Sequence, residues 1–347
     1  MRNKKKISAM LLAGTMMLSM GATAFAAPPV ENASITKDFV MAEGIATPDA
    51  TFKFTATKET KDAPDAIIND LEFKNKEQGT FANGIMTVEK KSDITFGEFP
   101  HAGEYVYTVE ETAENEEGVT YSTDRYTLRV YVKNGADDPE IQSMTAEKNT
   151  ANGTDANKVK EIKFVNTYRK DTALTITNNT TGDLADKTKD FSFTIKITPS
   201  ATEEHPTSYI GKIGDEEVTV MANTEKTFKL HDGETLSFDS LPAGTRYVVT
   251  EAGEEDGYTP SVAVVENGGS PVIRPAEGEA DGVSSAAAGE TNLAGENRNT
   301  VTFTNAYMDV TTTGIIMNNL PFVLVIGVAV LALGALAILK KQRFGRR

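Results

Sequence analysis

Two short patterns occur twice in this chain at nearly constant spacing, so the chain holds two copies of one unit. The pattern Tyr-x-Val-x-Glu ends at Glu111 and again at Glu251, and Phe-x-Asn-x-Tyr is centred on Asn166 and again on Asn305. With 347 residues, the chain is long enough for two domains of ordinary size, each with its own core. The repeat therefore predicts two similar domains in series.

Each copy has a third notable position near its start. Together with the Glu and Asn positions above, it gives the marked residues of each copy. Ile-Thr-Lys ends at Lys37, and the matching Ile-Thr-Asn ends at Asn178. From the first copy to the second, the start is displaced by 141 residues, the pattern that ends in Glu by 140 and the pattern centred on Asn by 139. Lys, Glu and Asn can together join a domain to itself through an amide bond, and only the first copy holds all three.

Alternation of apolar and polar residues predicts the fold class. Stretches such as 52–55, 105–109 and 191–195 alternate with a period of two, which is typical of half-buried strands. We therefore expect an all-β fold of two tandem β-sandwich domains, at 27–168 and 173–308.

Two connecting segments complete this organisation. Residues 169–172 are expected to form a short linker between the domains. Residues 266–300 are rich in Gly, Ala, Glu and Ser. We expect a mobile loop there, inside the second domain, because the closing strand follows it.

Both ends of the chain carry targeting features. Residues 1–26 have a basic start, an apolar run and an Ala-Phe-Ala cleavage pattern, which predicts a secretory signal peptide. Residues 320–339 hold no charge and predict a transmembrane helix, with 340–347 as a basic cytoplasmic tail. The chain between them is expected outside the cell.

Composition narrows the classes of function. The formal net charge is −15, although both terminal segments are basic, so an acidic middle part argues against nucleic-acid binding. The chain has no cysteine, so a covalent cross-link in an exported domain must use other chemistry. No metal-binding loop, nucleophile elbow or phosphate loop is present, and we expect no metal, no cofactor and no enzyme.

The marked residues of the first copy suggest that cross-link. Alternation places Glu111 on the aromatic, buried face of its strand, where a carboxyl favours its neutral form. Lys37 lies on a first strand and Asn166 on a last strand, which are neighbours in a closed sandwich. A desolvated Lys37 amine is a nucleophile, and its attack on the Asn166 amide would give an isopeptide bond.

Three segments of the chain resemble sequences of a known family. They are Thr-Ala-Leu-Thr-Ile at 172–176, Leu-Pro-Ala-Gly-Thr-Arg-Tyr-Val-Val-Thr-Glu at 241–251 and Phe-Thr-Asn-Ala-Tyr at 303–307. With them the chain resembles the T-antigen type of Gram-positive backbone pilin, built from streptococcal pilin isopeptide-linkage domains. The resemblance implies Ig-like, Cna-B/pilin-type sandwiches.

The resemblance also assigns roles. Lys37 and Asn166 would form the cross-link with Glu111 as catalytic acid, and Glu251 and Asn305 would take the matching positions of the second domain. Asn178 stands where the family has its reactive lysine, so the second domain is expected to lack the bond. Glu251 is then a buried acid without that role, or it pairs with Asn178 by hydrogen bonding.

Residues 309–319 resemble the family's sorting signal. Such a signal has a Pro-x-Thr-Gly type motif before an apolar span and a basic tail, and here Thr311 replaces the proline. By that resemblance, a sortase would cut between Thr313 and Gly314 and hold the threonyl group as a thioester.

The amine that attacks next decides the product. A lysine of another copy gives a pilus shaft, whereas the peptidoglycan cross-peptide gives a single anchored molecule. Family alignment points to Lys158, Lys160 or Lys163, and Lys158 fits best with a shift of one residue. The alternative is a solvated strand edge that simply carries lysines.

Two functions stay open from the sequence. The first is a structural pilin subunit that passes through the membrane and ends in the cell wall or a pilus. Its partners would be a sortase and other pilin copies. The second is a monomeric wall-anchored adhesin or surface binding protein of the same fold, with host surface ligands as partners.

Overall fold

The protein is described here from a computed structural model, and all of the described chain is β-structure or loop. The described residues are 33–149, 157–252, 257–275 and 282–307. Within these ranges there is no α-helix, as the sequence predicts. The predicted signal peptide, sorting signal, transmembrane segment and basic tail lie outside them.

No helix among the described residues is both long enough and apolar enough to span a membrane.

The chain divides into two compact units. The described residues of the first are 33–39, 48–74, 88–149 and 157–166. Those of the second are 40–47 and 75–87 together with the described residues from 167 onward. Each unit holds one of the two sets of marked residues.

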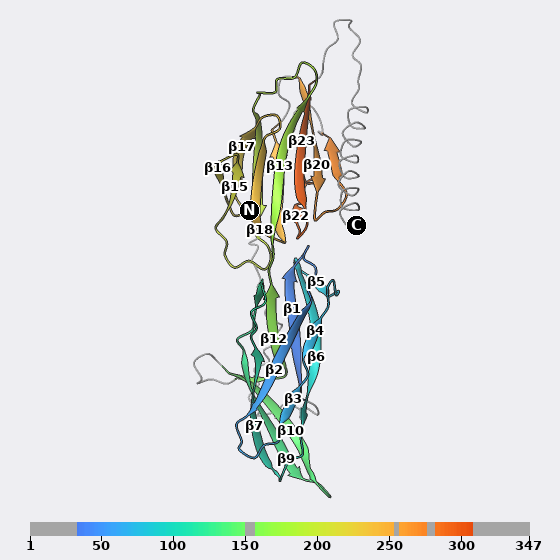
Figure 1. Ribbon diagram of the computed structural model, residues 1–347, viewed down its shortest axis with the longest axis vertical. Coiled ribbons are helices and arrows are strands. Elements are labelled where there is room, and N and C mark those ends of the chain that lie inside the picture. The colour runs from blue at the N-terminus through green and yellow to red at the C-terminus, as the bar shows by residue number, and fades with distance from the viewer. Residues whose placement is uncertain (1–32, 150–156, 253–256, 276–281, 308–347) are drawn as a thin grey trace, which may run out of the picture. The chain divides into compact units, whose positions relative to one another are not determined.

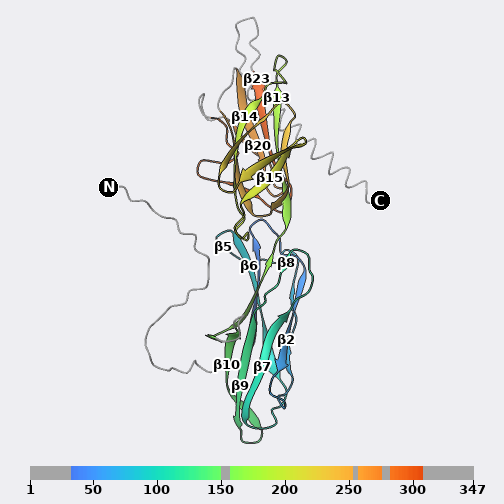
Figure 2. The ribbon, with the colours of Figure 1, turned by 90° about the vertical axis from the view of Figure 1, so that its left-hand side faces the viewer.

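The strands of the first copy form two six-stranded sheets. One contains β1 (Ser34–Ala42), β3 (Ala66–Ile68), β5 (Thr80–Ala82), β6 (Ile85–Phe96), β8 (Val119–Thr120) and β12 (Ile162–Tyr168). Its order is β3-β6-β1-β12-β8, with β5 paired to β6. The other contains β2 (Ala50–Lys58), β4 (Leu71–Phe73), β7 (Gly103–Thr112), β9 (Arg125–Asn134), β10 (Pro139–Asn149) and β11 (Asn157–Val159). Its order is β11-β10-β9-β7-β2-β4, and β10, β9, β7 and β2 lie side by side in Figure 2.

The strands of the second copy form a seven-stranded and a four-stranded sheet. The larger contains β13 (Asp171–Thr181), β15 (Ser208–Ile213), β16 (Glu216–Met221), β18 (Thr235–Pro242), β20 (Tyr258–Val265), β21 (Val272–Pro275) and β23 (Asn299–Tyr307). Its order is β16-β15-β18-β13-β23-β20-β21. The smaller contains β14 (Phe191–Thr198), β17 (Glu225–Leu230), β19 (Thr245–Glu251) and β22 (Asn292–Ala294) in the order β17-β14-β19-β22.

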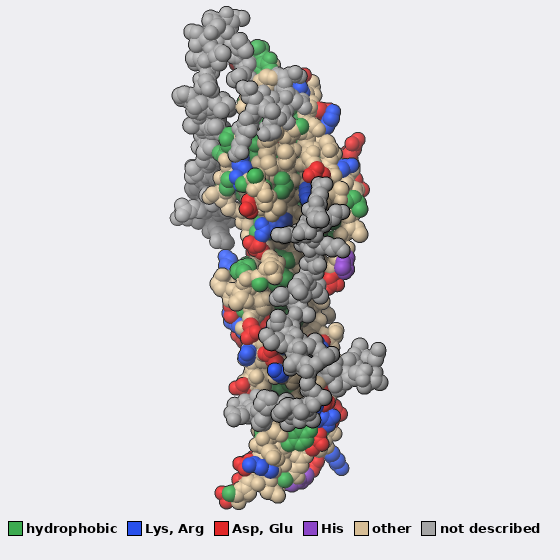
Figure 3. All heavy atoms as spheres, turned by 180° about the vertical axis from the view of Figure 1, so that it is seen from behind, with side chains coloured by type: hydrophobic (Ala, Val, Ile, Leu, Met, Phe, Trp, Pro, Cys, Tyr) green, Lys and Arg blue, Asp and Glu red, His purple; other side chains and the backbone are tan. Residues whose placement is uncertain are grey.

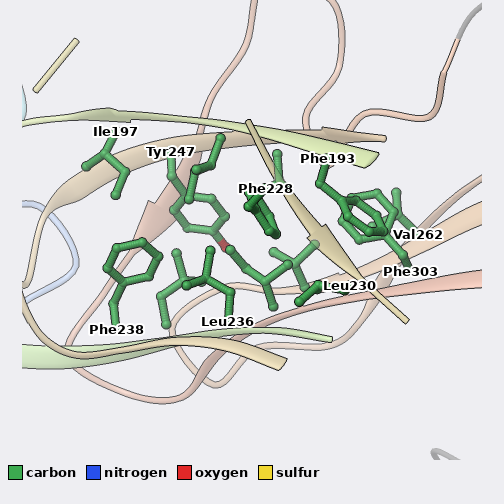
Figure 4. Close-up of a cluster of buried hydrophobic side chains, with 14 of the residues drawn as sticks. Phe193, Ile197, Phe228, Leu230, Leu236, Phe238, Tyr247, Val262 and Phe303 are labelled. Carbon is green, nitrogen blue, oxygen red and sulfur yellow. The ribbon is translucent and has the colours of Figure 1, made fainter. Parts of the chain in front are cut away.

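Alternation along the strands sends the aromatic side chains inward. On β7, Tyr105, Tyr107 and Val109 are fully buried, while the residues between them are partly exposed. In the second unit the ring of Phe193 lies 5.5 Å from that of Phe228 and 4.9 Å from that of Phe303 (Figure 4). Such buried rings supply much of the hydrophobic stabilisation of a sandwich.

The first and last strands of each copy are neighbours. In the first copy β1 and β12 are hydrogen-bonded, and in the second β13 and β23 pair in parallel (Figure 1). The parallel register sets Thr180 opposite Asn305. This topology brings residues more than a hundred positions apart onto adjacent strands, which the two candidate sites require.

Residues 266–300 differ from the mobile loop that the sequence predicts. Their described part contains β21 and β22, and Asn299 is 2% exposed. The Asn299 amide donates to the carbonyls of Ala173, Gly295 and Asn297, and its oxygen accepts from the backbone of Asn267 and Gly295. One buried side chain thus satisfies the backbone groups of a Gly-rich segment, which an estimate from composition cannot foresee.

Acidic and basic side chains are interspersed on the surface (Figure 3). Many form ion pairs across strands, such as Arg129 with Glu104 and Lys133 with Glu140. Exposed pairs of this kind contribute little to stability, about 0–1 kcal/mol each. One ion pair of the first unit, Lys37 with Glu111, is instead fully buried.

Candidate functional site in the first unit

Lys37 lies in the hydrophobic core. It points from β1 into the space between the two sheets and is 0% exposed. Its Nζ lies 4.4 Å from the centre of the Phe52 ring and 5.9 Å from that of Phe54, both on β2 of the facing sheet. A fully buried lysine is rare, and it needs a partner that is buried with it.

Glu111 is that partner. It stands near the end of β7, and its Oε1 accepts from Lys37 Nζ at 2.6 Å, with both side chains 0% exposed. The same Oε1 accepts from Asn166 Nδ2 at 2.7 Å. Oε2 is buried and has no hydrogen-bond partner among the described residues. One carboxyl group therefore touches both the amine and the amide.

Asn166 completes the cluster from β12. Its side chain is fully buried, with Nδ2 directed at Glu111 and Oδ1 accepting from the backbone N–H of Ser122 at 2.7 Å. The structure thus brings together Lys37, Glu111 and Asn166, the three residues marked in the first copy. Ser122 was not predicted, because any residue except proline has a backbone N–H and the sequence gives no signal for it.

Burial shifts both titrating groups toward their neutral forms. Desolvation lowers the pKa of Lys37 from 10.5 to about 8, although the charge and hydrogen bond of Glu111 oppose the shift. Desolvation likewise raises the pKa of Glu111, against the opposing effects of Lys37, Asn166 and Ser122. The two groups are coupled, so the pair holds one proton between them over an intermediate pH range. That one proton can reside on Glu111, which leaves the Lys37 amine neutral beside a carboxylic acid.

The second unit repeats this framework without the lysine. Asn305 Nδ2 donates to Asn178 Oδ1 at 3.0 Å, and Asn178 Nδ2 donates to the Leu230 carbonyl. Both asparagines and Glu251 are at most 2% exposed. Two amides therefore meet where the first unit holds an amide and an amine.

Pairs of phenylalanines show that the acids occupy equivalent places. In the first unit Phe54 is paired in register with Glu111, and its ring lies 5.3 Å from Phe164, two residues before Asn166. In the second unit Phe193 is paired with Glu251. Its ring lies 4.9 Å from Phe303, two residues before Asn305. The second unit thus matches the first at the acid and at the acceptor amide. It differs where the first unit has the Lys37 amine.

The three lysines near the end of the first copy have different surroundings. Lys158 and Lys160 are exposed, and Lys158 lies on β11 at the edge of its sheet. Lys163 Nζ is 2.7 Å from Asp38 Oδ2 and 3.8 Å from Glu89 Oε2. Although burial lowers it, the pKa of Lys163 is held above its ordinary value by Asp38. Of the three, Lys163 is the least available as a nucleophile.

The structure does not describe the candidate sortase cleavage site. Thr313 and Gly314 lie outside the described residues. Within the described ranges, no group of three or more His, Cys, Asp or Glu side chains is placed to hold a metal ion.

Comparison with known proteins matches both copies. Residues 34–169 match the family model described as a Spy0128-like isopeptide containing domain. Residues 172–307 match a second model, described as a Domain of unknown function (DUF7601). The cluster of Lys37, Glu111 and Asn166 therefore lies inside the isopeptide-domain match.

The chain is also similar to individual proteins. The chain is 28% identical to a protein named Pilin from Streptococcus pyogenes serotype M1, over 97% of this chain and 99% of the relative. It is 39% identical over 83 residues to the Pilus tip adhesin Cpa of Streptococcus pyogenes, which is 24% of this chain and 12% of the adhesin. A solved structure, the major pilin protein T3.2 from Streptococcus pyogenes, matches at 25% identity and a TM-score of 0.38, covering 81% of this chain and 100% of that chain.

These matches show which proteins the chain resembles. An isopeptide-containing domain combined with similarity to a pilin over nearly the whole chain supports a Gram-positive backbone pilin. Both curated relatives are named as pilus components, which supports a location at the cell surface.

The buried pair predicts an unusual dependence of stability on pH in the variant Asn166→Ala, which has no acceptor amide. Unfolding returns the pKa of Lys37 from about 8 to 10.5, so the unfolded chain binds more protons between these values. Stability of the first unit should therefore rise with pH across this window, by up to about 1.4 kcal/mol per pH unit. Denaturant unfolding at several pH values measures it.

The matched control is Asn166→Ala combined with Lys37→Met, which removes the titrating amine but keeps a long side chain. Its stability should lack this rise. Parallel curves for the two variants would show that Lys37 is not held in a desolvated state.

Proposed function

We propose that this chain is a structural pilin subunit whose first domain closes itself with a Lys37–Asn166 isopeptide bond. The observation that carries the proposal is the buried Glu111 carboxyl, which touches both the Lys37 amine and the Asn166 amide. The isopeptide-domain match over 34–169 and the similarity to a pilin support it. The domain acts once, on itself, and is not an enzyme.

The reaction exchanges one amide for another. The neutral Lys37 Nζ attacks Asn166 Cγ, and the bond from Cγ to Nδ2 breaks after a tetrahedral intermediate. Glu111 takes a proton from the attacking nitrogen and gives a proton to the leaving nitrogen, so ammonia departs and the carboxyl group is regenerated. The product is a secondary amide between Lys37 and Asn166, formed without an external reagent.

Fixed positions make this slow chemistry feasible. A carboxamide is a poor electrophile in water, but well-oriented groups reach effective molarities of roughly 10⁵–10⁸ M. Here both reacting groups are fully buried and share the Glu111 Oε1 as hydrogen-bond acceptor. Because folding creates this arrangement, the bond should form only after the first domain has folded.

The rest of the proposal concerns export and assembly. We assign 1–26 as a signal peptide, 27–168 and 173–308 as the domains with linker 169–172, and 320–339 as the span of a membrane-inserted precursor. A sortase would then act on the 309–319 region, before the 340–347 tail, and transfer Thr313 to a lysine of the next subunit or to the peptidoglycan cross-peptide. Exposure on an edge strand favours Lys158 as that lysine.

A second function is favoured by one comparison. The 83-residue match to a pilus tip adhesin has a higher identity, 39%, than the match to the pilin. A monomeric, wall-anchored adhesin would use the same fold and the same internal bond. Coverage of 99% of the pilin against 12% of the adhesin favours the shaft subunit.

Intact mass tests the internal bond. The full-length chain should be lighter than its sequence mass by one ammonia, beyond any removal of the signal peptide. Lys37→Ala, Asn166→Ala and Glu111→Ala should each restore the full mass, because each removes a reacting group. An unchanged wild-type mass, or a loss of two ammonia molecules, would refute the assignment.

Asn178→Lys tests whether the second site lacks only its nucleophile. Asn305 contacts Asn178 directly, and Glu251 is buried at the equivalent place, so the new lysine should react. We expect a second loss of ammonia, which disappears when Asn305→Ala is added. Asn178→Met, of similar length but without an amine, is the control for packing. A folded Asn178→Lys variant that loses only one ammonia would contradict the equivalence.

An immunoblot of boiled, detergent-treated wall extracts from the native host separates the two functions. A shaft subunit gives a ladder of high-mass bands that survives denaturation, and Lys158→Ala should abolish it. Lys163→Ala, which removes an ion-paired lysine, should leave the ladder in place. A single band near the monomer mass would favour the adhesin.

A further inference from the structure

The backbone N–H of Ser122 holds an unusual position beside the reacting atoms. It donates to Asn166 Oδ1 at 2.7 Å, whereas the amide nitrogen of the same side chain faces Glu111. Ser122 lies in the segment between β8 and β9, so this N–H is not part of a sheet ladder. It donates instead to the oxygen of the amide that the Lys37 amine would attack.

The segment around Ser122 is anchored on both sides. The ring of Tyr121 lies 5.9 Å from that of Phe52, the same ring that lies against Lys37 Nζ. On the other side, the Ser122 hydroxyl accepts from the backbone of Asp124, and the Asp124 carboxylate pairs with Lys148 at 2.7 Å. The donor is therefore held in place before any reaction begins.

Attack on an amide moves negative charge onto its oxygen. As the Lys37 nitrogen bonds to Asn166 Cγ, the electron pair of the carbonyl moves to Oδ1, and it returns when ammonia leaves. A fixed backbone donor at that oxygen stabilises the intermediate, and loss of one such donor costs roughly 10²–10³ in rate in other acyl-transfer sites. Glu111 does not make this contact, because within the Asn166 amide it accepts from Nδ2 and not from the side of Oδ1.

We propose that the Ser122 N–H is the oxyanion donor for the Lys37–Asn166 reaction. This inference rests on the proposed function and adds to it a catalytic group that is not a side chain. Glu111 and Ser122 then have different roles in the reaction. Glu111 transfers protons between the two nitrogens, and Ser122 stabilises the charge on the oxygen.

The test replaces one backbone amide by an ester. The α-hydroxy analogue of serine at position 122 removes the N–H and keeps the side chain. Full-length chain is isolated in denaturant from inclusion bodies, and its intact mass is measured first so that only unlinked material is used. Dilution from denaturant then starts folding and, after it, linking. Quenched samples give the rate of ammonia loss by mass, and circular dichroism gives the rate of folding.

Two substitutions accompany the ester. Lys133→Ala breaks an exposed ion pair outside the cluster and should link at the wild-type rate. Ser122→Pro removes the N–H by a second route and should link slowly. The ester variant should fold normally and link more slowly by roughly 10²–10³.

The pH profile separates this role from an effect on Glu111, whose pKa the same N–H helps to lower. Loss of an oxyanion donor lowers the maximum rate, whereas an effect through Glu111 alone shifts the acid limb and leaves the maximum unchanged. A wild-type maximum in the folded ester variant overturns this inference alone. Absence of ammonia loss in the wild type overturns the proposed function and this inference with it.

Discussion

Desolvation of one lysine and one glutamate is the constraint on which the first unit depends. Lys37 and Glu111 are both fully buried, and their mutual hydrogen bond at 2.6 Å offsets only part of the cost of removing them from water. That cost lowers the pKa of the amine and raises that of the acid. Burial that would merely destabilise an ordinary core would here prepare a nucleophile and a proton donor for the proposed reaction.

The strand order determines what the bond would achieve. β1 and β12 are the first and last long strands of the copy, and they are neighbours in one sheet. A covalent bond between Lys37 and Asn166 would carry tension directly from one strand to the other. The strands between them in the sequence would then bear none of the load, which suits a subunit of a fibre under pulling forces.

The second unit differs from the first by a small change that would remove the proposed chemistry. The acid, the acceptor amide and the supporting phenylalanines are all in place, and Asn178 stands at the position of the lysine. The two amides form a neutral hydrogen bond in the core, which contributes about 1 kcal/mol and can break and reform. A covalent clasp in the first unit and a reversible contact in the second would differ most under force.

Much of the fold followed from local patterns in the sequence. Alternation predicted the strands and the buried face of β7, and the repeat predicted which residues would share a site. Three features escaped prediction because they depend on tertiary contacts. They are the Ser122 backbone donor, the Asn299 network that organises part of 266–300, and the ion pair that occupies Lys163.

The most direct test of the account is peptide mapping of the wild-type full-length chain by tandem mass spectrometry. The account predicts one branched peptide in which the side chain of Lys37 is joined to that of Asn166, lighter by one ammonia than its two linear parts. Recovery of both linear peptides, unmodified and in full yield, would contradict it.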